Sequence, residues 1–489
     1  MDFLKYKFIL TVSLLLLNSI NLFAQTGVFV PELVNFDTAM TNLMKRYDIP
    51  GGQMAITYKG NLVYNRGFGY ANLETLKKVE PENSFRVGSV SKTITAIAIM
   101  KLVEKGLINL NDTVFGPGGI LNDPQYRNII DPRVLRIRVR NLLNHTGGWN
   151  RNLSGDPVLM SFAIAENMGT TPPADAETTI RYIISSTMLD FDPGTQFQYS
   201  NLGYMILGRV IEKVTGLEYE TYVRDSVLLP AGADIHSGFN LKEGRLQDEV
   251  NYYDYPGAPL VKSVYDNKTL VVRPYGALNL EAMAAEGGWV SSARNLCRII
   301  GAVDKYPTIP EILLQASVDT MIKPCTVNRS YAMGLYVNSF GTWWHDGSLY
   351  GTTAYISRTN YQLNWAIVMN GRPEDFNNFS VKVQMLFWNV LPTISTWPDH
   401  DITTSVQNTE NEHGIRIFPN PSDGRFSIST NMLISSVEIY DLTGVKIYTS
   451  TQTFPSGIAE INISSAPAGI YFLKVKSGSG NRVVRLIIK

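Results

Sequence analysis

A serine and a lysine three residues apart, Ser89 and Lys92, are the most informative pair in the sequence. They stand directly before the apolar run 94–102, which predicts a helix that begins at this point. Residues i and i+3 share one face of a helix, so Lys92 is placed to take the proton of the Ser89 hydroxyl. The pair predicts an activated serine nucleophile. On this motif alone, an ordinary helix start with an exposed lysine is the alternative.

Two further motifs stand at the ends of predicted elements: Tyr199-Ser200-Asn201 and His345-Asp346-Gly347. The first precedes the helical run 202–214, and the second lies between the strand-like runs 331–344 and 352–358. Ser-x-x-Lys, Tyr-x-Asn and a basic residue-x-Gly, in this order, resemble the serine beta-lactamase and penicillin-binding superfamily. The tyrosine in the second motif resembles the branch of class C beta-lactamases, DD-peptidases and family VIII esterases. The resemblance covers roughly 30–392.

The resemblance implies a role for each motif residue. Ser89 is the expected nucleophile, and Lys92 and Tyr199 share a proton network in which either residue is a candidate for the first base. Tyr199 is expected to protonate the leaving group, and Asn201 to orient Lys92 or bind a substrate carbonyl.

The backbone N–H groups of Ser89 and Ser348 are expected to form the oxyanion hole, and Gly347 to let the substrate approach the strand closely.

His345 departs from the beta-lactamase pattern, which has lysine at this place. Histidine resembles certain DD-peptidases, D-aminopeptidases and esterases, and it carries a positive charge only when protonated. Asp346 beside it would repel the carboxylate of penicillins and D-Ala-D-Ala peptides. We therefore expect an esterase, a D-peptidase or a DD-carboxypeptidase-like enzyme. A class C-type beta-lactamase, or a penicillin-binding module with little turnover, is the alternative.

Composition and residue spacing argue against nucleic-acid-binding, metal-binding and cofactor-dependent functions. Lysine and arginine total 43, as do aspartate and glutamate, so no net charge favours a nucleic-acid partner. His236, His400 and His413 show no metal-ligand spacing, and no cofactor motif is present. We expect a small-molecule or peptide substrate (an ester, a D-amino-acid peptide or a beta-lactam), with no cofactor. His145 is interpreted as fixing the turn that follows it.

The N-terminal residues 1–24 read as a secretory signal peptide, with Lys5 and Lys7 before an apolar stretch of ten residues. No later stretch is long and apolar enough to span a bilayer. Two cysteines, Cys297 and Cys325, are present, and the sequence leaves open whether they pair.

The elements expected to position the motifs form an α/β (α+β) sandwich. A helix at 31–47, a hairpin at 53–70 and the helix after Ser89 come first. A middle section at 105–285 and then strand-like runs up to residue 370, with a closing helix at 376–390, complete the unit. This order predicts an antiparallel sheet flanked by helices, with a mostly helical insertion, over 30–392.

After residue 392 a polar linker is predicted at 393–414, followed by a small all-β sandwich at 415–489. Its segments 418–421, 469–475 and 486–489 resemble the C-terminal sorting domain of the type IX secretion system of Bacteroidota. The resemblance implies the type IX secretion machinery as a partner. It also implies a protein that is secreted or displayed at the cell surface via the periplasm. A generic carbohydrate-binding or adhesion sandwich is the alternative.

Overall fold

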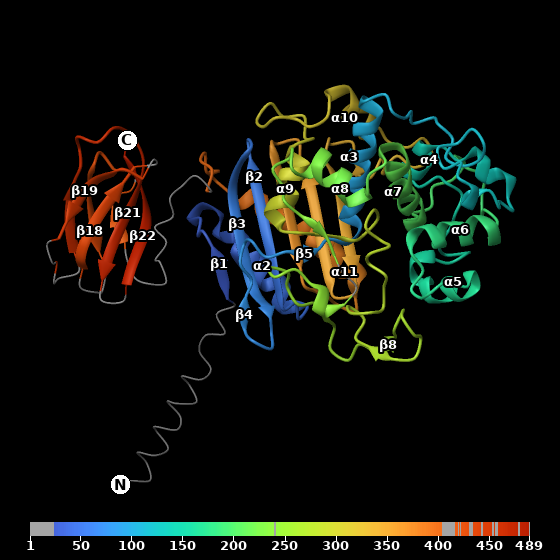
Figure 1. Cartoon of the computed structure of the whole chain (residues 1–489), viewed down its shortest axis with the longest axis horizontal. Helices are drawn as coiled ribbons and strands as arrows, with labels where there is room; N and C mark the ends of the chain where they lie inside the picture. The colour runs from blue at the N-terminus through green and yellow to red at the C-terminus, as the bar shows by residue number, and fades with distance from the viewer. Residues whose placement is uncertain are drawn as a thin grey trace, which may run out of the picture. The chain divides into compact units, whose positions relative to one another are not determined.

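The computed structural model describes residues 24–238, 241–402 and 416–488, except 419, 421, 430–433, 442–443, 452–453, 455–457 and 478–479. The predicted signal peptide, apart from Ala24, and residues 403–414 of the predicted linker lie outside the described residues. The chain divides into two compact units between Asp399 and His400, and each is described by itself (Figure 1).

The first unit is built on an eight-stranded sheet with the strand order β1-β3-β2-β14-β13-β12-β11, in which β4 pairs with β3. Every pair of neighbours is antiparallel. The strands are β1 Gln25–Gly27, β2 Gly51–Tyr58, β3 Asn61–Asn72, β4 Lys77–Lys78, β11 Tyr336–Val337, β12 Trp343–Leu349, β13 Thr352–Arg358 and β14 Leu363–Met369. The central strands β13 and β14 are buried along their whole length, because helices cover both faces of the sheet.

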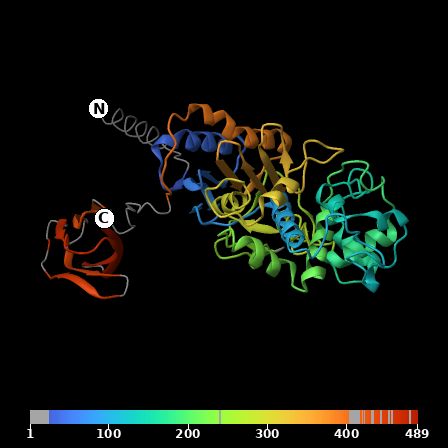
Figure 2. The same cartoon turned by 90° about the horizontal axis from the view of Figure 1, so that it is seen from above.

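Three helices cover the faces of the sheet, α2 Val34–Arg46, α9 Ala293–Gly301 and α11 Phe376–Val390, whereas α3 Ser91–Glu104 is buried along most of its length. Helices α2 and α11 lie side by side on one face, and α9 lies on the other (Figure 2). The ring of Phe387 stacks on Trp365 of β14 at 5.0 Å and on Phe36 of α2 at 5.6 Å. On the opposite face, the Cys297 thiol contacts the carbonyl oxygen of Ala55 at 3.5 Å. The predicted sandwich of an antiparallel sheet and flanking helices is confirmed.

A mostly helical section follows α3 and gathers to one side of the sheet (Figure 1). Its helices are α4 Val139–Leu143, α5 Ser161–Met168, α6 Ala176–Ser186, α7 Asn201–Thr215 and α8 Tyr219–Val223. Helix α7 begins cleanly because the Ser200 side chain accepts a hydrogen bond from the Gly203 N–H, which satisfies a free donor of the first turn. This cap fixes the position at which the second motif enters the helix.

Short elements join the sheet to the helical section: β5 Phe85–Arg86, β6 His236–Ser237, β7 Tyr253–Asp254, β8 Val261–Lys262, β9 Leu270–Val271, β10 Trp289–Ser291, α10 Gln315–Met321 and β15 Gly371–Arg372. Strand β10 pairs with β5 just before the nucleophile motif. It therefore ties the start of α3 to the segment 285–291.

The second unit is a strand-rich sandwich of two sheets with the orders β16-β17-β20 and β19-β18-β21-β22. The strands are β16 Arg416–Phe418, β17 Arg425–Ser429, β18 Ile434–Tyr440, β19 Lys446–Ser450, β20 Ile458–Asn462, β21 Gly469–Ser477 and β22 Gly480–Ile488. Alternate side chains such as Val437, Ile439, Leu473 and Val475 fill its core. The predicted small all-β unit is confirmed, whereas Pro419, Pro421 and Lys489 of the predicted sorting segments lie outside the described residues.

Two sequence expectations differ from the structure in detail. The run 331–344 is not one strand, because Gly334 and Gly341 adopt positive φ angles of 74° and 71° and turn the chain. The third motif consequently lies inside β12 and pairs with β13, instead of following a strand end. Trp397, within the predicted linker, packs its ring 5.5 Å from Tyr58 and belongs to the first unit.

Cys297 and Cys325 are both buried and carry free thiols. Within the described parts of the chain, no helix combines the length and the apolar character that a bilayer crossing requires.

Candidate active site

Ser89 lies in a single 3-10 turn, Gly88–Val90, which runs directly into α3. The Val87 N–H donates to the carbonyl of Trp289 at 2.9 Å, so β10 holds the entry of this turn. Two threonines fix the helix itself: the Thr93 hydroxyl donates to the Gly334 carbonyl and the Thr95 hydroxyl to the Ala285 carbonyl. The serine is therefore presented on a buried, well-anchored helix start.

The Lys92 side chain is completely buried and contacts three oxygen atoms. Its Nζ atom lies 3.0 Å from Ser89 Oγ, 2.8 Å from Asn201 Oδ1 and 2.7 Å from the backbone oxygen of Glu286. The last two oxygens can only accept hydrogen bonds. A neutral amine that donates its two hydrogens to them directs its lone pair at the Ser89 hydroxyl.

Electrostatics favours the neutral amine. Burial lowers the pKa of Lys92 to about 7, against an opposing effect of the Glu286 carboxyl group, which raises this pKa. The arrangement can therefore remove a proton from Ser89 near neutral pH.

Asn201, the first residue of α7, owes its orientation to Asp156. The Asn201 side-chain amide donates to Asp156 Oδ2 at 2.7 Å, which turns its Oδ1 toward Lys92. Asp156 itself is held by the backbone N–H of Val158.

Tyr199 lies beside both Lys92 and Ser89. Its ring centroid is 4.9 Å from Lys92 Nζ, and its hydroxyl hydrogen-bonds that of Ser89. Burial raises the pKa of Tyr199 well above its ordinary value, so the phenol is neutral near pH 7. Its ring packs on the His145 imidazole at 4.2 Å between centroids.

The backbone of β12 presses against the nucleophile turn. A Cβ atom added at Gly347 would lie 1.9 Å from the Val87 oxygen and 3.1 Å from the Ser89 nitrogen. One added at Gly88, which has a φ of 52°, would lie 2.7 Å from the Ser348 nitrogen. Both glycines are thus required for the close approach that brings the backbone N–H groups of Ser89 and Ser348 to the same place.

His345 lines the site, but both of its ring nitrogens contact the protein. Nε2 lies 3.2 Å from the Tyr331 hydroxyl and Nδ1 lies 2.6 Å from the backbone oxygen of Asp346. Burial lowers the pKa of His345 to about 4, so the ring is uncharged near neutral pH. The third motif of this chain consequently places no fixed cation here.

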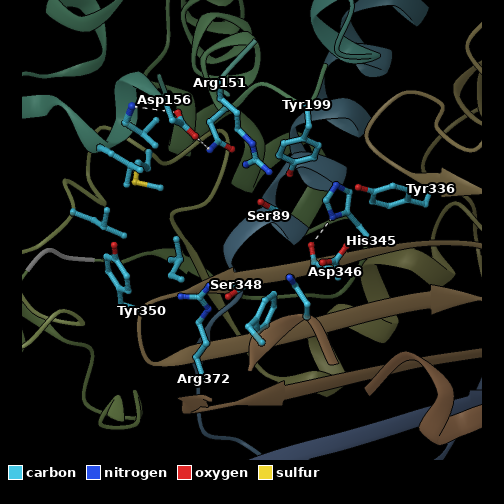
Figure 3. A pocket seen from close by; sticks show the side chains of 18 residues that line it. Ser89, Arg151, Asp156, Tyr199, Tyr336, His345, Asp346, Ser348, Tyr350 and Arg372 are labelled. Atoms are coloured by element: carbon cyan, nitrogen blue, oxygen red, sulfur yellow. Dashed lines mark hydrogen bonds between the residues drawn. The ribbon is translucent and has the colours of Figure 1, made fainter. Parts of the chain in front are cut away.

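These groups open onto a cavity of about 470 Å³ (Figure 3). Arg151 and Tyr199 project into it from the helical side, and Ser348 and Arg372 from the sheet side. Its charged lining residues are Arg151, Asp156, Asp346 and Arg372. In the described residues, no group of three or more His, Cys, Asp or Glu side chains is arranged to hold a metal ion.

The structure brings together all seven residues predicted from the motifs: Ser89, Lys92, Tyr199, Asn201, His345, Gly347 and Ser348. Sequence reasoning missed five others: Arg151, Asp156, Glu286, Tyr331 and Arg372. Glu286 is 1% exposed, and neither oxygen of its carboxyl group has a hydrogen-bond partner in any other described residue. Burial raises the pKa of Glu286 to about 8. An acidic residue directly before Gly287-Gly288, ahead of a strand, was the only sequence signal for it.

Two family models match the chain. The beta-lactamase model matches residues 36–384, and the model of the secretion system C-terminal sorting domain matches residues 416–489.

Protein flp of Staphylococcus aureus is 24% identical over 335 residues, which cover 68% of this chain and 61% of that protein. The chain therefore spans less than two thirds of this relative.

Two of the solved structures that share the fold are a hydrolase and an amidase. One is EstCE1, a hydrolase with promiscuous acyltransferase activity, with a TM-score of 0.57 and 18% identity; the alignment covers 73% of this chain and 98% of that one. The other is the D-amino acid amidase of Ochrobactrum anthropi SV3, with a TM-score of 0.56 and 20% identity, covering 74% and 98% of the two chains.

Proposed function

Because the chain belongs to the beta-lactamase family and ends in a sorting domain for type IX secretion, we propose that it is an exported serine hydrolase. It forms an acyl-enzyme at Ser89 and cleaves an ester or an amide. Its tail directs it to the cell surface or the exterior.

The observation that carries this proposal is the contact between the buried amine of Lys92 and the Ser89 hydroxyl. A lysine that is fully buried, 3.0 Å from a serine hydroxyl and lowered in pKa to about 7, is suited to act as a general base near neutral pH. Two acceptors occupy its N–H groups, so its lone pair is available only to Ser89.

In the acylation step, Ser89 Oγ attacks the substrate carbonyl carbon and its proton moves to Lys92 Nζ. The backbone N–H groups of Ser89 and Ser348 stabilise the negative charge on the carbonyl oxygen. The bond to the leaving group then breaks, and the leaving group takes a proton. Tyr199 is placed to deliver it, because its neutral phenol contacts the Ser89 oxygen and its ring flanks Lys92, which restores the Tyr199 proton.

Deacylation reverses these roles. A water molecule gives its proton to the Tyr199 and Lys92 pair as its oxygen attacks the acyl carbon. Ser89 Oγ departs from that carbon and regains a proton. The carboxylic acid product leaves the cavity.

The uncharged His345 and the carboxylate of Asp346 disfavour a substrate carboxylate beside β12. This supports an ester or amide substrate over a penicillin, and the fold is also that of an amidase and of a hydrolase with acyltransferase activity. Arg372 at the sheet side of the cavity is the observation that keeps a class C-type beta-lactamase as the second candidate.

The test is a comparison of three substrates with purified mature protein: a short-chain p-nitrophenyl ester, a D-amino-acid amide and a chromogenic cephalosporin. We expect the kcat/KM for the ester or for the amide to be the highest of the three. A kcat/KM highest for the cephalosporin would establish the second candidate. Stoichiometric acylation by the cephalosporin without turnover of any substrate would instead identify a penicillin-binding module.

A further inference from the structure

A continuous hydrogen-bonded chain connects the helical side of the site to β12. The Ser200 N–H donates to His145 Nδ1 at 3.2 Å, and His145 Nε2 lies 3.0 Å from the Tyr331 hydroxyl. The same hydroxyl lies 3.2 Å from His345 Nε2, and His345 Nδ1 lies 2.6 Å from the Asp346 backbone oxygen. None of the three side chains is more than 1% exposed. Solvent therefore cannot replace any of these contacts.

The groups at the two ends of this series of hydrogen bonds, the Ser200 N–H and the Asp346 carbonyl, decide which atom carries each hydrogen. A backbone N–H can only donate, so His145 Nδ1 is an acceptor and its hydrogen is on Nε2. A carbonyl oxygen can only accept, so His345 Nδ1 carries a hydrogen. With both rings neutral, His145 donates to Tyr331, and each ring nitrogen has one partner. The Tyr331 hydrogen has two acceptors, His345 Nε2 and the hydroxyl oxygen of Tyr204, which itself donates to the Leu143 carbonyl.

The surroundings oppose a proton on either ring. Burial, reinforced by Lys92 and Arg151, lowers the pKa of His145 well below its ordinary value, and burial lowers that of His345 although Asp346 raises it. The remaining titratable groups that face the chain are phenols: Tyr199, Tyr204 and Tyr336. Since each phenol is neutral near pH 7, none offers a full counter-charge to an imidazolium.

The hydrogen-bonded series also holds Tyr199 of the second motif in place. The His145 ring contacts the Tyr199 ring at 4.2 Å and the Tyr331 ring at 4.8 Å. A rotation of His145 would therefore displace Tyr199 from Ser89.

We propose that His145 and Tyr331 are positioning residues that hold His345 as a fixed, uncharged imidazole with its hydrogen on Nδ1. The third motif then serves as a neutral wall of the substrate cavity and takes no part in proton transfer. This inference rests on the proposed function for its effect on rate, whereas its structural core is independent of activity.

The first experiment is NMR of protein labelled with 15N in its five histidines. His345→Gln and His145→Gln variants assign the two buried rings by loss of signal. Between pH 5 and 8, we expect His345 to show a protonated Nδ1 and an unprotonated Nε2 with no titration, and His145 to show the opposite tautomer. The Ser89→Ala protein, which lacks the proposed nucleophile, should show the same tautomers. This result is therefore independent of whether the proposed function is correct. A wild-type His345 that titrates near pH 6.5, or that carries its hydrogen on Nε2, overturns the proposal.

Tyr331→Phe removes the hydroxyl and keeps the ring. His345 Nε2 then loses its donor, so we expect the His345 signals to shift and its titration midpoint to rise. We also expect kcat/KM on a neutral ester to fall about tenfold and to gain a new ionisation below pH 7. Tyr336→Phe is the matched control, because the Tyr336 ring packs against both Tyr331 and His345 but takes no part in the series of hydrogen bonds. In this variant, His345 should keep the tautomer that it has in the wild type. A Tyr331→Phe protein with wild-type His345 signals overturns the proposal. The wild-type spectrum decides alone if this variant does not fold.

Discussion

The amine of Lys92, whose side chain is completely buried, lies 3.0 Å from the hydroxyl of Ser89, which faces the cavity. Burial disfavours the ammonium form, and the two other contacts of the amine are oxygens that only accept. The same burial that makes the lysine a base would make an unpaired ammonium costly. Proton transfer from the serine is therefore tied to its onward passage to the leaving group.

The proton-transfer roles of Lys92 and Tyr199 can be distinguished by comparing the rates of their variants on substrates with different leaving groups. Lys92→Ala should reduce the acylation rate about 100- to 10,000-fold for every substrate, because attack needs the base. Tyr199→Phe should cost at least about tenfold more for an amide than for a p-nitrophenyl ester, whose leaving group departs without a proton. Single-turnover rates on both substrates measure this. Equal losses for the two substrates in Tyr199→Phe would remove the tyrosine from leaving-group protonation.

The pH dependence should follow the lysine. Only the neutral amine accepts the serine proton, so kcat/KM should rise with pH through a midpoint near the Lys92 pKa of about 7. The ionised form of the Glu286 carboxyl group raises this pKa, and Glu286→Gln keeps the shape but cannot take up that charge. The midpoint should therefore move to lower pH. Glu281→Gln, an exposed change five residues away, serves as control and should leave the profile in place. A midpoint that stays or moves upward in Glu286→Gln would contradict the assignment.

Gly347→Ala should damage both the fold and the oxyanion hole. The added Cβ would lie 1.9 Å from the Val87 oxygen, so β12 and the nucleophile turn must separate. We expect a loss of about 1–3 kcal/mol in the free energy of unfolding and about 100- to 1000-fold in kcat. Gly118→Ala, where an added Cβ meets nothing within 4 Å, is the control. Thermal unfolding and steady-state rates give the answer, and a wild-type rate in Gly347→Ala would exclude the oxyanion role.

Much of this site follows from the sequence, because the nucleophile, the lysine and the tyrosine each stand at the start of a helix that periodicity predicts. The third motif was found by its residue types, but its place inside β12 was missed because two glycine turns break the preceding run. Asp156 and Glu286 were not predictable. Each acts on Lys92 across more than 60 residues of chain, and local periodicity carries no information about such a contact. Tyr331 belonged to a predicted strand, and only the fold places its hydroxyl between two histidines.

The tail should be dispensable for catalysis and required for export. The compact units divide after Asp399, and Trp397 packs on the first unit, so the truncation should end at residue 399. We expect this protein to keep wild-type kcat/KM in lysate within about twofold. In a host with type IX secretion it should accumulate in the periplasm. A truncated protein that reaches the medium would contradict the sorting role, and one that loses activity would contradict the domain boundary.

The central claim, an acyl-enzyme at Ser89, is tested most directly by intact-mass measurement after reaction with a fluorophosphonate. The wild type should gain the mass of one phosphonyl group, and Ser89→Ala should gain none. Ser91→Ala should react like the wild type, because the Ser91 hydroxyl accepts a hydrogen bond from the Trp289 N–H and is no part of the proposed proton network. A phosphonyl adduct on Ser89→Ala, or none on the wild type, would contradict the claim.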